Sequence, residues 1–437
     1  MKADQASEET GPVSGDTADT GRRDFLRQSA GLATGATLIS VAPVASAGFS
    51  PGFGAHVAGS DAPELSEVRV GFMPLTDCAS VVVAAAEGFD RKHGIRIVLS
   101  RETSWASVRD KLLNSELDAA HVLYGLIYGL QMGIGGPKQD MNVLMTLNHN
   151  GQGISFARQM ETLGAVDGAS LARLVASRPA GSFTFAQTFP TGTHAMWLYY
   201  WLAANGIHPM RDVKSIVVPP PQMIAACRAG TMHGFCVGEP WNQQGIVDGV
   251  SFSVASSQDI WNDHPEKVLG TSAAWTEANP HAARALVAAV LDASRWIDAA
   301  DANRRRAAEL MAGAAFVNTA YEVIAGRMLG HYQDGRGRSW TDSLRLKFFD
   351  DGAVNFPWLS DGMWLLTQFR RWGLLGRDPD YLALARQVNR TDIYADAASA
   401  VGVGVPANAM RSHRLIDGVV WDGSDPARYA GSFAVHA

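Results

Sequence analysis

Short apolar runs alternate with helical patterns of about ten residues in the first third of the chain. The apolar runs predict buried strands at 68–72, 95–99 and 117–124. Helical patterns lie between them, at 78–87 and 105–114. Ser104 directly precedes the second of these, where a serine side chain can cap a helix. Strands that alternate with helices predict parallel βαβ units.

The same alternation begins again about 60 residues later. Strands are predicted at 183–187, 213–218 and 234–237, with helices at 194–204 and 222–229 between them. Residues 111–122 and 226–237 also share one rhythm of helix, tight turn and short apolar strand. Two similar α/β halves predict two lobes with a cleft between them. Residues 281–437 are mainly helical in pattern, and we expect them to return to the first lobe and wrap it.

The composition limits the possible classes of ligand more than it limits the possible folds. The chain has 437 residues, of which 47% are hydrophobic and 18% charged, as in ordinary globular proteins. Its net charge of −6 gives no bulk basicity for nucleic acid or anionic lipid, so an anionic ligand needs a local positive site. Cys78, Cys227 and Cys236 form neither a disulfide framework nor a metal-ligand spacing. Buried free thiols are favoured, with a Cys227–Cys236 bridge after export as the alternative.

The N-terminal segment has the pattern of an export signal. An arginine pair, Arg22-Arg23, precedes a moderately apolar run at 30–44, and Ala45-Ser46-Ala47 follows as a cleavage site. This pattern predicts a twin-arginine signal peptide at 1–47; the alternative is a helical tail with a chance arginine pair. No cysteine stands at the cut, and no later apolar run reaches about eighteen residues. We therefore expect a soluble periplasmic protein.

Four polar loops occupy strand-to-helix junctions, where ligands collect in open parallel sheets. They cover 75–77, 103–105, 191–194 and 219–222. Free N–H groups at a helix start favour an anion, although any one loop alone is more simply an N-cap. Gln152 lies between glycines at the crossover of the two halves, and Lys267 lies beside a proline turn. Taken alone, the first is more often a turn glutamine and the second an isolated surface lysine.

Motifs of common enzyme classes are absent from the sequence. There is no GxSxG, no P-loop, no GxGxxG that opens a βαβ unit and no HExxH, and the histidines do not cluster with acids at metal spacing. Residue patterns alone thus favour a two-lobed binder of a small anion over an enzyme, with no cofactor.

Seven segments in order resemble the nitrate-binding proteins of nitrate/bicarbonate ABC importers. They are GFMPLTD at 71–77, SWASVRD at 104–110, GQGIS at 151–155, GTH at 192–194, PPPQM at 219–223, CVGEPWN at 236–242 and HPEK at 264–267. The resemblance covers 66–437. It implies an α/β, two-lobed periplasmic-binding-protein fold with parallel-rich sheets flanked by helices, closing as a C-shaped clamp. Residues 48–154 and 260–437 would form lobe I, and 155–259 lobe II.

The resemblance also implies the ligand contacts: Trp105, Gln152, His194, Pro220 and Lys267. We expect Thr76, Thr193 and Glu239 to support them, with Glu239 as the candidate neighbour that holds the second ring nitrogen of His194. Nitrate is planar, monovalent and acceptor-only, so the ammonium of Lys267 and the N–H groups of Trp105 and Gln152 suit it.

Lys267 also separates branches of the family. By the resemblance, bicarbonate binders carry an acidic residue at this position and hold calcium, whereas a lysine makes a metal unnecessary. The expected function is capture of nitrate, and possible nitrite capture, for an ABC importer permease with its cytoplasmic ATPase. The alternatives are a bicarbonate or sulfonate binder of the same fold, or a cytoplasmic nitrate sensor, against which the export signal argues.

Overall fold

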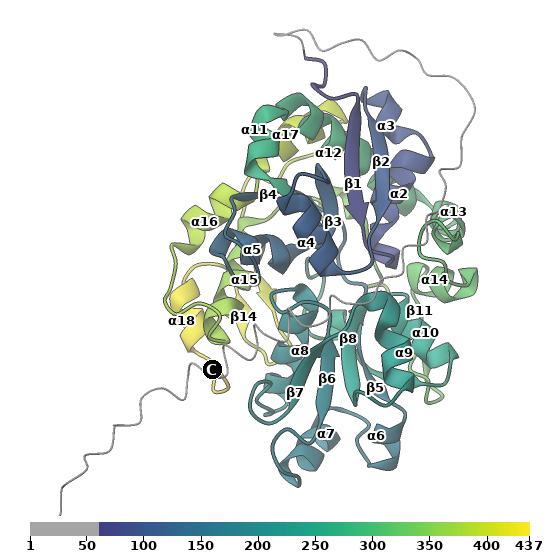
Figure 1. The fold of residues 1–437 in the computed structure, drawn as a ribbon, viewed down its shortest axis with the longest axis vertical. Coiled ribbons are helices and arrows are strands. Elements are labelled where there is room, and N and C mark those ends of the chain that lie inside the picture. The colour runs from purple at the N-terminus through teal and green to yellow at the C-terminus, as the bar shows by residue number, and fades with distance from the viewer. Residues whose placement is uncertain (1–60) are drawn as a thin grey trace, which may run out of the picture. The chain divides into compact units, whose positions relative to one another are not determined.

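Two mixed five-stranded sheets organise the part of the chain that this computed structural model describes, residues 61–437 (Figure 1). The predicted signal peptide at 1–47 lies outside the described residues. Cys78, Cys227 and Cys236 are buried and free, so the described residues contain no Cys227–Cys236 bridge. Among the helices of 61–437, none combines the length and apolar character needed to cross a bilayer.

The first sheet has the strand order β2-β1-β3-β10-β4. Its strands are β1 (Glu67–Phe72), β2 (Arg96–Arg101), β3 (Ala119–Leu123), β4 (Met141–Thr146) and β10 (Lys267–Ser272). β1 pairs in parallel with β2 and β3, whereas β10 is antiparallel to both of its neighbours. The helices that follow β1, β2 and β3 include α2 (Ala79–Ala86), α3 (Phe89–Lys92), α4 (Trp105–Leu113) and α5 (Tyr124–Met132). The predicted parallel units are therefore present here.

The second sheet repeats this plan with the order β7-β6-β8-β5-β9. Its strands are β5 (Gln152–Ala157), β6 (Thr184–Gln187), β7 (Lys214–Val217), β8 (Gly234–Gly238) and β9 (Ser251–Ser256). β6 is parallel to β7 and β8, and β5 is antiparallel to β8 and β9. The helices are α6 (Gln159–Thr162), α7 (Gly168–Ala176), α8 (Thr193–Ala204), α9 (Met223–Arg228) and α10 (Trp241–Val247). Each sheet thus combines predicted parallel units with unpredicted antiparallel strands.

The chain passes between the sheets through segments that lie side by side. His149 bridges antiparallel to Pro265 and also to Lys347, so three segments far apart in sequence meet here. The Asn150 amide donates to the carbonyl oxygens of Leu344 and Arg345 at 3.0 and 3.3 Å. Asn150 and the following glycine both have positive φ, at 60° and 92°, as a sharp change of chain direction requires.

The C-terminal third is mainly helical, as predicted. It contains α11 (Ala273–Ala278), α12 (Pro280–Ala299), α13 (Asp301–Ala312), α14 (Tyr321–Met328), α15 (Leu359–Arg371), α16 (Tyr381–Val388), α17 (Thr391–Ala400) and α18 (Pro426–Gly431), with the hairpins β11 (His331–Gln333)–β12 (Ser339–Thr341) and β13 (His413–Arg414)–β14 (Val420–Trp421). α12 packs against α2 and α3 of the first sheet.

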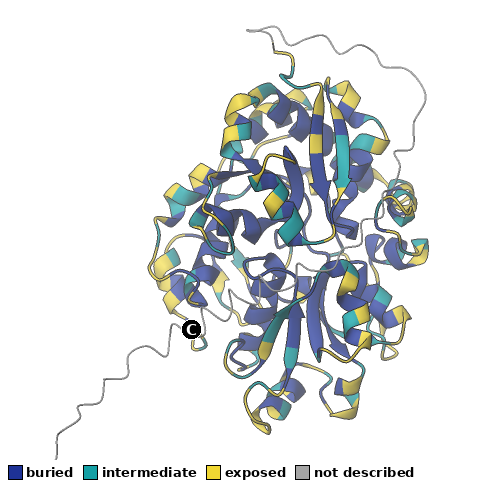
Figure 2. Ribbon diagram, viewed as in Figure 1, coloured by how far each residue is buried: buried dark blue, intermediate teal, exposed yellow. Residues whose placement is uncertain are grey.

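This third does more than wrap the first sheet. Trp364 of α15 stacks on Trp197 of α8, with ring centroids 4.8 Å apart. Tyr200, also on α8, donates its hydroxyl to Asp417 at 3.0 Å. This third therefore also contacts α8, in addition to packing on the first sheet. Figure 2 shows buried residues along both sheets and exposed residues mainly on the outer helices and loops.

Candidate ligand-binding site

Lys267 is the first residue of β10 and is completely buried. Its ammonium Nζ lies 2.8 Å from Asp77 Oδ2 and forms a second ion pair with Glu266 Oε1. Burial opposes the charged form, but the carboxylates of Asp77 and Glu266 hold the pKa of Lys267 above its usual value. The simpler interpretation of Lys267 as a surface lysine is therefore wrong.

Asp77 lies on η1 (Thr76–Cys78), the 3-10 helix that follows β1. His121 of β3 places Nε2 2.7 Å from Asp77 Oδ1, while its Nδ1 accepts the backbone N–H of Met73 at 3.4 Å. This network assigns the imidazole proton to Nε2. Burial favours the neutral acid, but Lys267 and His121 outweigh it and lower the pKa of Asp77 to about 2. Asp77 is therefore an ionised, acceptor-only group.

Glu266 connects the ammonium to α8. The hydroxyl of Thr193 donates to Glu266 Oε1 at 3.0 Å, and the indole N–H of Trp197 donates to Oε2 at 3.4 Å. Burial raises the pKa of Glu266 to about 7; the charge of Lys267 opposes this rise and that of Asp77 adds to it. Thr193 is thus linked to the ammonium of Lys267 through the carboxyl of Glu266.

His194 stands beside Thr193 at the start of α8. Its Nδ1 lies 2.6 Å from Thr188 Oγ1, and its Nε2 lies 3.6 Å from Glu266 Oε1, too far for a hydrogen bond. Burial and the nearby ammonium of Lys267 hold the pKa of His194 well below its usual value. Its second nitrogen is therefore held by Thr188.

Glu239 was expected to orient His194, but its carboxylate has other partners. Its Oε1 forms an ion pair with Arg327 Nε at 3.3 Å, and its Oε2 accepts the backbone N–H of Gln243 at 3.1 Å. Its backbone oxygen accepts the N–H of Thr76 at 2.7 Å. The carboxylate is committed to an arginine of α14, which the sequence pattern had not brought near, and Glu239 contributes a main-chain link between the two sheets.

Among the buried side-chain atoms of residues 61–437 that lack a hydrogen-bond partner, four belong to residues expected at the site. They are Thr76 Oγ1, Trp105 Nε1, Gln152 Nε2 and His194 Nε2. Buried donors normally find partners, so unpaired groups of this kind require an explanation. The ring of Trp105 lies 5.8 Å from the ammonium of Lys267, which places its indole in the same neighbourhood.

Gly238 lets these groups approach one another. A Cβ at this position would lie 3.3 Å from Asp77 Oδ2 and 3.5 Å from His194 Nε2, so a side chain would fill the space between them. Gln152 is paired with Gly238 across β5 and β8. Residues directly opposite one another present their side chains to the same face, so Gln152 faces this space too.

Pro220 is less closely tied to the cluster. It begins η2 (Pro220–Gln222), is buried, and accepts the backbone N–H of Met223. No hydrogen bond or ion pair in the described part of the chain joins it to the group around Lys267.

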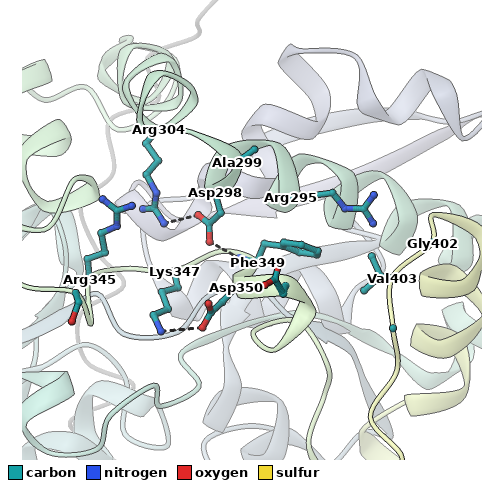
Figure 3. Close-up of a pocket in the computed structure, with 13 residues that line it drawn as sticks. Arg295, Asp298, Ala299, Arg304, Arg345, Lys347, Phe349, Asp350, Gly402 and Val403 are labelled. Atoms are coloured by element: carbon teal, nitrogen blue, oxygen red, sulfur yellow. Dashed lines mark hydrogen bonds and ion pairs between the residues drawn. The ribbon is translucent and has the colours of Figure 1, made fainter.

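A cavity of about 730 Å³ lies elsewhere and includes none of the predicted site residues (Figure 3). Two of its cations are paired with carboxylates: Arg304 with Asp298 at 2.6 Å, and Lys347 with Asp350 at 3.0 Å. Across 61–437, no group of three or more histidine, cysteine, aspartate or glutamate side chains is arranged to hold a metal ion.

Asp77, His121, Glu266 and Gly238 belong to this site but were not predicted as site residues. Asp77 and Glu266 both stand inside the segments that carry the family resemblance, at 71–77 and 264–267. A buried lysine requires partner charges, so these two acidic residues could have been picked out within the segments. His121 had no signal of its own in the strand pattern.

The two sheets, each flanked by helices, are joined by adjacent crossing segments that meet at His149 and Pro265. Unpaired polar groups from both halves are buried around the ammonium of Lys267. This arrangement defines a two-lobed solute-binding protein. The model of the NMT1-like family matches residues 61–312. The nitrate/nitrite binding protein NrtA of Nostoc sp. is 36% identical over 396 residues, which cover 87% of this chain and 89% of that protein.

Two further likenesses agree. The nitrate import ATP-binding protein NrtC of Synechocystis sp. is 33% identical, over 87% of this chain and 57% of that protein. The crystal structure of the periplasmic nitrate-binding protein NrtA from Synechocystis PCC 6803 superposes with a TM-score of 0.81 at 34% identity, covering 86% of this chain and 100% of that one. The chain belongs to the NMT1-like family, together with the NrtA proteins.

Proposed function

We propose that this protein captures nitrate, and also nitrite, between its two lobes and delivers the anion to an ABC importer. The observation that carries the proposal is the set of unpaired buried polar groups around the ammonium of Lys267. An acceptor-only anion would satisfy the N–H groups of Trp105, Gln152 and His194. The protein would bind and release its ligand without covalent chemistry.

The charge of the site favours a monovalent anion over bicarbonate with calcium. Lys267 supplies a cation where the bicarbonate branch is expected to place an acid. Nitrate and nitrite lack a proton to donate, which suits a site whose free groups are mainly donors. An alkanesulfonate is tetrahedral at sulfur and carries an organic tail, so it would need a roomier site than a flat nitrate ion does.

With the lobes divided at the crossing segments, both lobes would supply groups that contact the ligand. Thr76, Trp105 and Lys267 come from elements of the first sheet, and Gln152 and His194 from elements of the second. The indole of Trp241 donates to the carbonyl of Pro74 at 3.1 Å, a direct bond between the two parts. An anion that bridges donors from both would shift the population toward the closed form.

The partners and route follow the family resemblance. The closed form would dock on a membrane permease whose cytoplasmic ATPase drives release. The twin-arginine pattern at 22–23 and the small residues at 45–47 would export the folded chain to the periplasm.

A ligand panel tests the function. The chain from residue 48 is melted with nitrate, nitrite, bicarbonate with and without calcium, and an alkanesulfonate. We expect nitrate and nitrite to raise the melting temperature and the other ligands to leave it unchanged. A shift with bicarbonate and calcium alone, or with the alkanesulfonate alone, would contradict the proposal.

A further inference from the structure

The ammonium of Lys267 is already surrounded by negative charge. Asp77 and Glu266 both contact it, and all three side chains are at most 1% exposed. With both carboxyls ionised, this group carries one net negative charge before any anion arrives. A second negative charge in a buried site is strongly unfavourable, because like charges repel most where water is excluded.

The two carboxyls differ in what holds them. Asp77 accepts hydrogen bonds from the ammonium of Lys267 and from the imidazole N–H of His121, so its charge is fixed. Glu266 Oε1 accepts from the ammonium of Lys267 and from the hydroxyl of Thr193, whereas its Oε2 receives only the indole N–H of Trp197 at a long 3.4 Å. Of the four oxygens of the two carboxyls, Glu266 Oε2 therefore has the weakest hydrogen bond, and it is the oxygen that a proton would occupy.

The other titratable groups around Glu266 are held neutral. Burial lowers the pKa of His194 well below its usual value, that of His264 to about 3, and that of His121 below its usual value. Burial also raises the pKa of the Cys236 thiol well above its usual value. Burial raises the pKa of Glu266 to about 7, so this carboxyl alone in the group changes charge near neutral pH.

We propose that Glu266 is a specificity-determining residue that enters the anion complex as a neutral carboxylic acid, so that each monovalent anion is bound together with one proton. The proton comes from solvent, and no bond other than O–H is formed. This inference rests on the proposed function, since it concerns the same anion.

A neutral Glu266 changes which anions the site would bind. With Lys267 balanced by Asp77, the complex carries the single charge of the anion and no more. A divalent anion would add a second uncompensated charge, so the arrangement discriminates by charge as well as by shape. The hydroxyl of the acid would also add a donor facing an acceptor-only ligand.

Proton uptake makes the affinity depend on pH. In an open, hydrated cleft the pKa of Glu266 would return toward its usual value of 4.5, whereas burial in the closed site raises it to about 7. Between these two values the protein gains a proton on binding, so the nitrate dissociation constant rises about tenfold per pH unit.

Calorimetry tests the proposal directly. Nitrate is titrated into the chain from residue 48 between pH 5.5 and 8, in buffers of different ionisation enthalpy. We expect uptake of roughly three quarters of a proton per nitrate near pH 6.5, as a pKa that rises from 4.5 to about 7 requires, and a matching rise of the dissociation constant. Nitrate binding without proton uptake across this range would overturn the proposal. An absence of nitrate binding at every pH would instead overturn the proposed function, and this inference with it.

Two variants separate the role of Glu266 from burial alone. Glu266→Gln keeps the shape and a neutral donor, so we expect it to bind nitrate without proton uptake. Glu102→Gln is the matched control, because Glu102 is also buried and pairs with a lysine, Lys111, at 2.8 Å outside the site. It should retain the proton uptake of the parent.

A spectroscopic measurement on the unmodified protein covers the case in which Glu266→Gln fails to fold. The infrared difference spectrum between nitrate-bound and nitrate-free protein should gain a carbonyl band of a protonated carboxylic acid, which shifts in D2O. A difference spectrum at pH 6.5 without such a band would overturn the proposal.

Discussion

Replacing Lys267 with methionine is the sharpest perturbation of the site. Methionine keeps much of the length of the side chain and removes the charge, so two buried carboxyls lose their shared cation. Two unit charges 2.8 Å apart, as for Lys267 Nζ and Asp77 Oδ2, attract by about 6 kcal/mol at an effective dielectric constant of about 20. Desolvation offsets part of this, and removal of one partner of a buried pair typically costs about 3–5 kcal/mol.

The variant should therefore lose stability and affinity together. Urea unfolding at pH 7.5 should show a free energy of unfolding lower by about 3–5 kcal/mol. If the folded variant is obtained, calorimetry should show nitrate affinity weaker by about 30- to 5,000-fold, which corresponds to about 2–5 kcal/mol for a desolvated charge contact.

Lys111→Met is the matched control, because Lys111 also pairs with a buried glutamate, Glu102, but its side chain is 34% exposed. It should lose about 0–1 kcal/mol and keep its nitrate affinity. The reasoning is refuted if Lys267→Met loses no more stability than Lys111→Met and binds nitrate as the parent does.

Three further predictions concern single groups of the site. Trp105→Phe keeps an aromatic ring but loses a donor to a charged ligand, so calorimetry should show nitrate affinity lower by about 10- to 150-fold, or about 1.5–3 kcal/mol; an unchanged affinity would remove Trp105 from the contacts. Gly238→Ala places a methyl group 3.3 Å from Asp77 Oδ2 and should weaken nitrate binding at least about tenfold, since a misplaced polar shell loses hydrogen bonds; binding equal to that of the parent would show that the space stays empty in the complex. With saturating nitrate, the contribution of Glu266 to stability should be fully present below about pH 4.5 and lost as pH rises toward 7, because burial raises its folded-state pKa above the unfolded value. The difference between parent and Glu266→Gln in urea unfolding should follow this slope, by about 3 kcal/mol in total, and a flat difference would contradict it.

Local patterns predicted the parallel half of each sheet. The apolar runs that became β1 and β6 are flanked by turns, and Ser104 caps α4 by accepting the N–H of Ser107 at 3.1 Å. These features depend on neighbours within a few residues, which a sequence displays directly.

The antiparallel strands were missed because their partners are distant. β10 pairs with β3, and Leu269 stands opposite His121 although the two are far apart in the chain. β4, β5 and β9 likewise pair with strands or crossing segments that local periodicity does not reveal. The missed strands include those that begin at Gln152 and Lys267, two of the residues assigned to the ligand by resemblance.

The resemblance named the candidate ligand contacts, but the sequence could not show which charged residues pair with them. Asp77 is 190 residues from Lys267 in sequence, and nothing in the spacing shows that they meet. Glu239 follows a strand end and was expected to hold His194, whereas its carboxylate forms an ion pair with Arg327 of α14, from the C-terminal third. Ion pairs depend on tertiary placement, which local patterns do not specify.

Under the proposed function, the positions of Gln152 and Lys267 would give the crossing segments a part in binding. Each is the first residue of a strand that follows a crossing, so the proposed closure would move both of them. Thr193 reaches across to Glu266 and ties α8 to the segment directly before Lys267. In this structure the carboxyl of Glu266 forms an ion pair with the ammonium of Lys267. Under the proposed function, an incoming anion would share that ammonium with Glu266, and protonation of the carboxyl would release the ammonium without leaving a second charge in the closed site.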